Sequence, residues 1–458
     1  MNPDPGTSSA FGRSASNAVA AAIQVVLCVL LGIVAAVHPA PAAASEEFDF
    51  KRQLFGPLST LAVTVESIDH SSGKVAVNGC DTQCPTIPFD FDWGDNVVDT
   101  GWFPREHVYQ DLNRNYLVTV TASYGAGRSD DRQAFVRFRP PVIEPISLPA
   151  RLAVSIPHGE DYALAARLYP LPTDLVTFDD TFFPLVSRDV ISYVLSLAAV
   201  VQHDFANGDL FEVNAAFRQL LLRDADFVGG MYSLWYTTPL AFASGDHGIS
   251  GSVAYSSFFH EMGHNLTLNS PAACYYGGKI DGNANAIYSE TMANIFAHAT
   301  TYDLLSRWGA LGLRSDLATE IRLSAVESAW VIRRAYEDYL QNAMPFTSWN
   351  KPKTPEDETF TTFMTLAFRF MAHAEEGGAG YTRPLRRMME LLQLFDQELA
   401  KRYDRLHNNT AADTFRATLM VAALSHAFER NLCAEFTELG FPICHETYDE
   451  LLERANNR

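Results

Sequence analysis

The spacing of apolar residues divides the chain into two parts. Between residues 57 and 139, β-rich runs such as LAVTVESI and YLVTVTASY alternate with turn clusters such as HSSG, WGDN and GAGRSDD. Even spacing of such runs predicts a small antiparallel β-sandwich. After residue 250 the apolar period becomes helical, and amphipathic helices are expected at 285–308, 313–343, 359–377, 383–403 and 413–431.

A proline-rich segment separates the two parts. RPPVIEPISLP at 139–149 contains four prolines, which favour an extended connector over a helix or a central strand. The expected order is a linker at 45–56, the sandwich at 57–139, a second linker at 140–149 and a domain at 150–458, mixed α/β over 150–250 and mainly helical over 251–458.

The N-terminal 44 residues have the order of a targeting segment. An apolar run from Ala18 to Val37 precedes small residues that include Ala42 and Ala44, which predicts a signal peptide over 1–44. The run is also long enough to span a bilayer as an uncleaved anchor. Both alternatives place the rest of the chain outside the cell, secreted or anchored at the surface.

The net charge limits the binding partners to be expected, and the cysteines bear on disulfide formation in an oxidising compartment. The 54 acidic and 34 basic residues give a net charge of -20, which repels nucleic acid and anionic lipid, so a membrane partner is expected only if the N-terminal segment is an anchor. In an oxidising compartment, short separations favour disulfides between Cys80 and Cys84 and between Cys433 and Cys444, with Cys274 left over.

The stretch SSFFHEMGHN at 256–265 contains the sequence's strongest chemical motif. His260 and His264 are four residues apart, so on a helix both imidazoles face one point, with Glu261 beside them. This geometry suits one zinc ion with a nearby base. Gly263 inside the helix costs about 1 kcal/mol relative to alanine, which suggests close packing at this face.

Catalytic zinc normally takes three protein ligands, so a third residue is needed. The extended pattern HExxHxxGxxH is absent, because Thr267 and Ser270 stand where it requires glycine and histidine. An aspartate-type site is also poorly supported, because Ala273 occupies the position before Tyr-Gly where aspartate is needed, and Asp281 is a poor substitute.

The best third ligand is Glu290, in AIYSETMANIFAHA. In a helix, this carboxylate lies away from the apolar stripe and can complete a His2Glu site from a neighbouring helix. Asn294, one turn later, can accept a hydrogen bond from a ligand imidazole. The apolar stripe consists of Met292, Ile295, Phe296 and Ala299.

Two resemblances follow from these residues. FDFDWGDN at 89–96, followed by His107, Tyr109 and YLVTVTA at 116–122, resembles a polycystic kidney disease (PKD) domain, an Ig-like sandwich that serves as a spacer or as a contact module for proteins or glycans. Asn96 stands where that family commonly has a second glycine.

HEMGHN followed by ETMANIF resembles the gluzincin zinc metallopeptidases, and most closely the enhancin-type, mucin-degrading branch. ALSHAFERNLCAEFTELGFPI near the C-terminus is similar to that branch's closing segment. The resemblance implies an α+β, mainly helical zincin-type domain with one zinc ion on His260, His264 and Glu290, and Glu261 as catalytic base. It covers at most the last ~200 residues, and Thr267 departs from the glutamine often found nearby.

We therefore expect a secreted zinc metalloendopeptidase that acts on proteins, with glycoproteins or mucins implied by the resemblance. The alternatives are a zinc aminopeptidase, for which no amine-binding motif is recognisable, and a binding or adhesion protein with an inactive metal site, which the intact Glu261 disfavours. The stretch 232–243 fits either a substrate-binding edge strand or an interior strand. Candidates to stabilise the transition state, none preferred by spacing, are Tyr255, Tyr275, Tyr276, Tyr288 and His298.

Overall fold

The structure is a computed structural model. It describes residues 50–83, 87–139, 142–143, 188–206, 221–224, 231–233, 239–242, 255–267, 283–351, 356–378, 380–399 and 409–457. The expected signal peptide or anchor, Cys84, Cys274 and most of the proline-rich linker lie outside these residues. None of the helices within the described ranges is both long and apolar enough to span a membrane.

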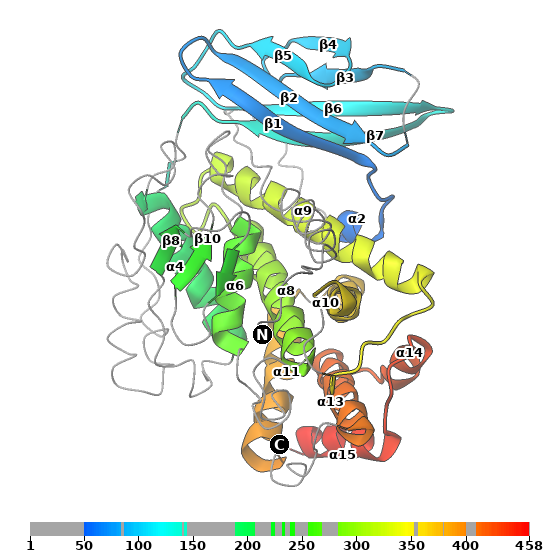
Figure 1. The fold of residues 1–458 in the computed structure, drawn as a ribbon. Helices are drawn as coiled ribbons and strands as arrows, with labels where there is room; N and C mark the ends of the chain where they lie inside the picture. Colours follow the sequence, from blue (N-terminus) through cyan, green and yellow to red (C-terminus); the bar gives the residue numbers. More distant parts are fainter. Residues whose placement is uncertain are drawn as a thin grey trace, which may run out of the picture.

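Two antiparallel sheets form the N-terminal part (Figure 1). Alternate side chains of the longer strands are buried, as expected where each sheet turns one face to a shared core. The sandwich predicted from the sequence is thus confirmed. One sheet has the order β1-β2-β5, with β1 (Leu61–Asp69), β2 (Lys74–Asp81) and β5 (Arg105–Val108); the other has the order β4-β3-β6-β7, with β3 (Phe89–Asp92), β4 (Val98–Gly101), β6 (Tyr116–Gly125) and β7 (Arg128–Val136).

The residues of the PKD-like motif meet in the sandwich core. The ring of Trp93, which is fully buried, stacks on His107 with centroids 4.8 Å apart. The Tyr109 hydroxyl donates to the Trp93 carbonyl oxygen (2.8 Å), and Nε2 of His107 lies 2.8 Å from the Asp95 carboxylate. Asn96 has a φ of 72°, in the left-handed region that asparagine tolerates better than most residues.

The second part is mainly helical and has its own large core. The five helices expected from periodicity are present as α8, α9, α10, α11 and α13, with α11 continued by a π-helical turn. The elements are α2 (Phe50–Phe55), α4 (Arg188–Phe205), α6 (Tyr255–Thr267), α8 (Asn283–Ser306), α9 (Ser315–Gln341), α10 (Glu356–Gly377), α11 (Thr382–Leu394), η3 (Phe395–Leu399), α13 (Thr410–Phe428), α14 (Cys433–Glu438) and α15 (His445–Asn456).

Helix α8 lies at the centre of this part (Figure 1). It packs against α4, α6, α9 and α10. Its residues from 291 to 300 are all buried, which explains why apolar and small side chains occur on several of its faces. The two helices that carry the metal motif, α6 and α8, therefore meet within the core.

A three-stranded sheet lies beside α6 (Figure 1). The strands β8 (Leu221–Asp224), β9 (Met231–Ser233) and β10 (Pro239–Phe242) have the order β8-β10-β9, and β10 runs parallel to β8 and antiparallel to β9. The stretch 232–243 thus contributes to both kinds of strand: β9 is an edge among the described strands, and β10 is central. Strand β9 contacts α6.

Residues 50–55, which we assigned to a linker, form α2. Leu54 is buried in the helical core, and α2 packs against α9 and α10. The contacts that order this segment come from residues more than 250 positions later in the chain, so local sequence patterns do not reveal them.

The disulfide expected between Cys433 and Cys444 is not formed: both cysteines are free thiols. Sγ of Cys433, buried at the start of α14, lies 3.3 Å from Nδ1 of His445, and Sγ of Cys444 accepts from the Thr447 hydroxyl (3.4 Å). Each sulfur thus has its own polar neighbour. Cys80 is also free, and its expected partner lies outside the described residues.

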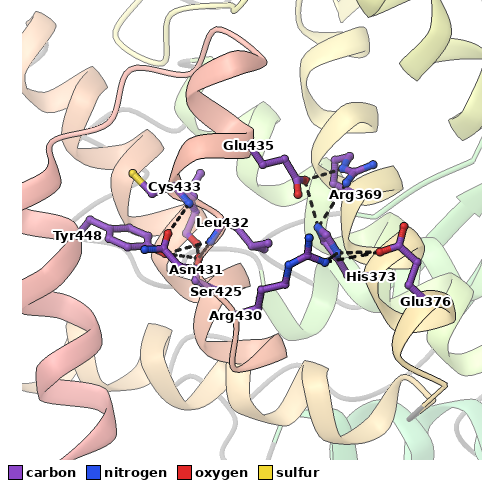
Figure 2. Close-up of polar contacts among 11 residues, drawn as sticks. Arg369, His373, Glu376, Ser425, Arg430, Asn431, Leu432, Cys433, Glu435 and Tyr448 are labelled. Carbon is purple, nitrogen blue, oxygen red and sulfur yellow. Dashed lines mark hydrogen bonds and ion pairs between the residues drawn. The ribbon is translucent and has the colours of Figure 1, made fainter.

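Polar side chains join α10 to α14 (Figure 2). The Glu435 carboxylate accepts from Nε of Arg369 (2.7 Å) and lies 3.1 Å from Nε2 of the buried His373. Next to this group, Oγ of Ser425 accepts from the Tyr448 hydroxyl (2.7 Å), which joins α13 to α15. These contacts fix the C-terminal helices to the rest of the helical part.

Candidate metal centre

The helix expected around the HExxH motif is α6. Phe258 and Phe259 are fully buried and anchor one side of it in the core. The amide nitrogen of the buried Gln202, on α4, donates to the Phe259 carbonyl oxygen (2.7 Å). On the face that carries the histidines, His260 is partly exposed and His264 is buried, so solvent reaches this face at His260.

Gly263 allows α6 to approach α8 closely. A Cβ atom at this position would lie 3.0 Å from Cα of Ala293 and 3.1 Å from Cβ of Phe296, closer than ordinary van der Waals contact. A larger residue would separate the helices at this point. The glycine is followed directly by His264 and faces the α8 turn after Glu290, so its small size brings the two halves of the motif together.

Three donor groups converge between α6 and α8. Nε2 of His260 lies 3.0 Å from Nε2 of His264 and 3.1 Å from Oε2 of Glu290, and Nε2 of His264 lies 3.3 Å from Oε1 of Glu290. The two imidazole planes are nearly perpendicular, at 88°. The structure thus brings together all three residues that the sequence proposed as ligands.

These spacings fit a zinc ion. In a tetrahedral site with bonds of about 2.0–2.1 Å, neighbouring ligand atoms are about 3.3 Å apart. The 3.0 Å between the two imidazole nitrogens is close to that value, and so are the 3.1 Å and 3.3 Å from these nitrogens to Oε2 and Oε1 of Glu290. Two imidazoles and one carboxylate are also a common protein ligand set for catalytic zinc, with the fourth position left for water or substrate.

Glu261 is buried beside the two histidines. One of its carboxylate oxygens and one ring nitrogen from each of His260 and His264 all lie within 4.8 Å of one another, so these three residues alone form a possible metal-binding group. The Glu290 carboxylate, from the neighbouring helix, also contacts both imidazoles, with its two oxygens 3.1 Å and 3.3 Å from their Nε2 atoms.

The imidazoles also determine the charge of Glu290. Burial alone would raise the pKa of this carboxyl group, but the nearby His264 and His260 outweigh that effect and lower the pKa well below its usual range. The group is therefore a carboxylate at neutral pH, the form in which it binds a cation.

Ser289 makes an imidazole contact that the sequence did not identify. Its hydroxyl lies 2.7 Å from Nδ1 of His264, so the nitrogen opposite the other donors is hydrogen-bonded. Asn294, expected to accept from an imidazole, instead donates through its amide nitrogen to the Glu290 carbonyl oxygen (2.7 Å). Asn294 thus holds the helix beneath Glu290, and Ser289 orients the histidine. Ser289 lies beside Glu290 in the sequence, but serines are too common in helices for that position to mark it.

The residues considered for transition-state stabilisation have other surroundings where the structure describes them. Nε2 of His298 lies 3.1 Å from the Tyr381 hydroxyl, and burial lowers the pKa of His298 to about 3, so this ring is neutral. Tyr255 and Tyr288 are buried in the core. Tyr275 and Tyr276 lie outside the described residues.

Comparisons with known proteins return nothing for this chain: no family model matches it, and neither a curated protein nor a solved structure matches it.

Proposed function

We propose that this protein is a zinc-dependent peptidase, in which His260, His264 and Glu290 hold one zinc ion and Glu261 is the general base. The observation that carries the proposal is the Glu290 carboxylate, which lies 3.1 Å and 3.3 Å from the two imidazole nitrogens. Two histidines four residues apart are common on helices. A carboxylate from a second helix that contacts both imidazoles is the arrangement of a His2Glu zinc site.

Different side chains of the protein would have separate roles in hydrolysis. A bound zinc ion would polarise the substrate carbonyl and lower the pKa of a water molecule toward about 7. Glu261 accepts the proton of the attacking water and delivers it to the leaving nitrogen. The Ser289 hydroxyl lies 2.7 Å from Nδ1 of His264; by accepting a hydrogen bond from Nδ1–H it would leave Nε2 of that ring unprotonated and able to bind zinc.

The substrate is proposed to be an extended segment of a protein or glycoprotein. Strand β9 is an edge among the described strands and contacts α6, so a peptide that pairs with it would run near the histidines. The enhancin-type resemblance favours mucin-like glycoproteins, and the N-terminal sequence favours secretion. An endopeptidase is preferred to an aminopeptidase because the sequence contains no recognisable motif for a free amine.

Digestion of casein and of a mucin-type glycoprotein, combined with zinc analysis, tests the proposal. We expect the native protein to carry one zinc ion and to cleave at least one substrate internally. Glu261→Gln should keep zinc and cleave at least about 100-fold more slowly, the loss typical of a missing general base. Glu290→Gln should lose zinc and activity together.

Three results would point elsewhere. Zinc binding without cleavage of either substrate by the native protein would indicate a binding protein. Release of single N-terminal residues would indicate an aminopeptidase. Unchanged cleavage by Glu261→Gln would remove Glu261 from the mechanism.

A further inference from the structure

Helix α9 lies between the β-sandwich and the helices of the metal centre (Figure 1). Two buried ion pairs join its upper face to the sandwich: Arg132 of β7 pairs with Glu327 at 3.0 Å, and Arg137, just after β7, pairs with Glu320. The side chains of Arg137 and Glu320 are 0% and 1% exposed. A charge this deeply buried needs its partner in place, so the sandwich has a fixed position on α9.

The same stretch of α9 also holds the first turn of the metal helix. Ser324 lies one turn after Glu320 and one turn before Glu327. The Ser256 backbone N–H donates to the Ser324 hydroxyl oxygen (2.8 Å), and the Ser256 hydroxyl donates to the Ser324 carbonyl oxygen (2.8 Å). The sandwich and α6 are therefore attached to α9 within two helical turns.

The position of Ser256 on α6 connects this attachment to the metal ligands. Ser256, His260 and His264 are spaced by four residues, so they follow one another along the same side of the helix. A rotation of α6 that released Ser256 from α9 would turn both imidazoles away from Glu290. The contacts with Ser324 thus limit the rotation that most affects the site.

The Arg137 guanidinium also lies near the start of α6. Tyr255, the first residue of this helix, is fully buried, and the positive charge of Arg137 offsets part of the rise in its pKa that burial causes. The sandwich thus contributes a charge that contacts α9 and lies near the beginning of α6, which a module serving only as a spacer would not need.

We propose that the β-sandwich is a positioning element of the metal centre. The Arg137–Glu320 pair fixes α9, and Ser324 fixes the first turn of α6, so that His260 and His264 face Glu290. This inference rests on the metal centre of the proposed function, but it does not depend on peptidase activity. Arg137, Glu320 and Ser324 are positioning residues, because they act through α6.

The double variant Arg137→Met/Glu320→Leu tests the proposal in the full chain. It replaces the pair with apolar side chains and leaves no unpaired buried charge, so the chain should still fold. The matched control is Arg369→Met/Glu435→Leu, which removes the ion pair between α10 and α14. Both are compared with the native chain by amide hydrogen exchange without metal and by zinc affinity in competition with a chelator.

We expect the Arg137/Glu320 variant to exchange amides of α6 at least about tenfold faster, while those of α13 keep their native rates. Its zinc affinity should fall about tenfold or more, as when other groups that orient metal ligands are removed. The control should keep native exchange in α6 and native zinc affinity. Native exchange in α6 together with native affinity in the Arg137/Glu320 variant would overturn the proposal.

Ser324→Ala provides a second test that does not disturb the ion pair. It removes the hydroxyl that accepts from the Ser256 N–H, and Ser425→Ala removes a buried serine hydroxyl between α13 and α15 as its control. Only Ser324→Ala should speed exchange in α6; equal exchange in both variants would contradict the proposal. Because exchange is measured without metal, a native chain that binds no zinc would refute the proposed function without deciding this test.

Discussion

The His264 imidazole is held at both of its nitrogens. Nδ1 lies 2.7 Å from the Ser289 hydroxyl, and Nε2 lies 3.3 Å from the Glu290 carboxylate. Adjacent residues of α8 therefore contact opposite sides of the same ring. This arrangement fixes the orientation of His264 before any metal binds, which reduces the entropy lost on binding.

Removing the Ser289 hydroxyl should weaken metal binding without unfolding the protein. We expect Ser289→Ala to reduce zinc affinity by about tenfold, because the imidazole loses the partner that fixes its tautomer. Asn294→Ala is the comparison: its amide bonds to backbone, so it should cost about 1 kcal/mol of unfolding free energy and change zinc affinity less. Chelator competition and thermal denaturation measure the two effects. If Asn294→Ala had the larger effect on zinc affinity, the roles assigned here would be reversed.

At the scale of elements, the distance between α6 and α8 determines whether the ligands meet. Gly263→Ala should destabilise the protein by about 1–3 kcal/mol, because the new methyl group meets the Ala293 backbone at 3.0 Å. It should also reduce zinc affinity, because the helices must separate near His264. Denaturant unfolding and zinc titration measure both effects.

Gly377→Ala is the matched control, since Gly377 ends α10 and a Cβ there would meet nothing within 4 Å. This change should be neutral or stabilising by up to about 1 kcal/mol. A Gly263→Ala variant as stable and as zinc-binding as Gly377→Ala would show that the helices do not require this close contact.

Because of the contacts between α10 and α14 (Figure 2), the free energy of unfolding should decrease as the pH is lowered. Burial raises the pKa of Glu435, but hydrogen bonds from His373 and Arg369 outweigh burial and lower the pKa to about 2 from 4.5. A carboxyl group with a lowered folded-state pKa stabilises the protein above its unfolded-state pKa. That stabilisation is lost as the pH falls from 4.5 toward 2.

When the pH is lowered from about 5 to about 2.5, the Glu435→Gln variant should therefore lose about 2 kcal/mol less unfolding free energy than the native protein. Unfolding by denaturant at several pH values measures the difference from the native protein. Identical pH dependence in both proteins would mean that Glu435 is not stabilised as a carboxylate.

Local patterns in the sequence predicted most elements and the three side chains that meet between α6 and α8. The five long helices follow from apolar periodicity, and the spacing of His260 and His264 is a property of one helix turn. Glu290 was found because its helix has an apolar stripe that excludes it. Helix α2, the contact of Ser289 and the free Cys433 and Cys444 were missed, because each depends on tertiary packing that no local period encodes.

In the whole molecule, α9 connects the β-sandwich to the helices that carry the histidines and Glu290. A proline-rich segment predicted two independent parts, yet Arg137 pairs with Glu320 across 183 positions of the chain, and Arg132 pairs with Glu327 across 195. Charged residues on a helix are usually solvated, so the sequence gives no reason to expect these glutamates to be buried. The sandwich and α6, which carries both histidines, consequently contact the same helix.

The proposed function requires that two imidazoles from α6 and one carboxylate from α8 hold a single metal ion. Diffraction from crystals of the zinc-loaded native protein, measured on both sides of the zinc absorption edge, would locate this ion. We predict one anomalous peak per chain, about 2.0–2.2 Å from Nε2 of His260, Nε2 of His264 and a carboxylate oxygen of Glu290. No peak between these side chains, or a zinc ion bound without Glu290, would show that the three residues do not form the metal site.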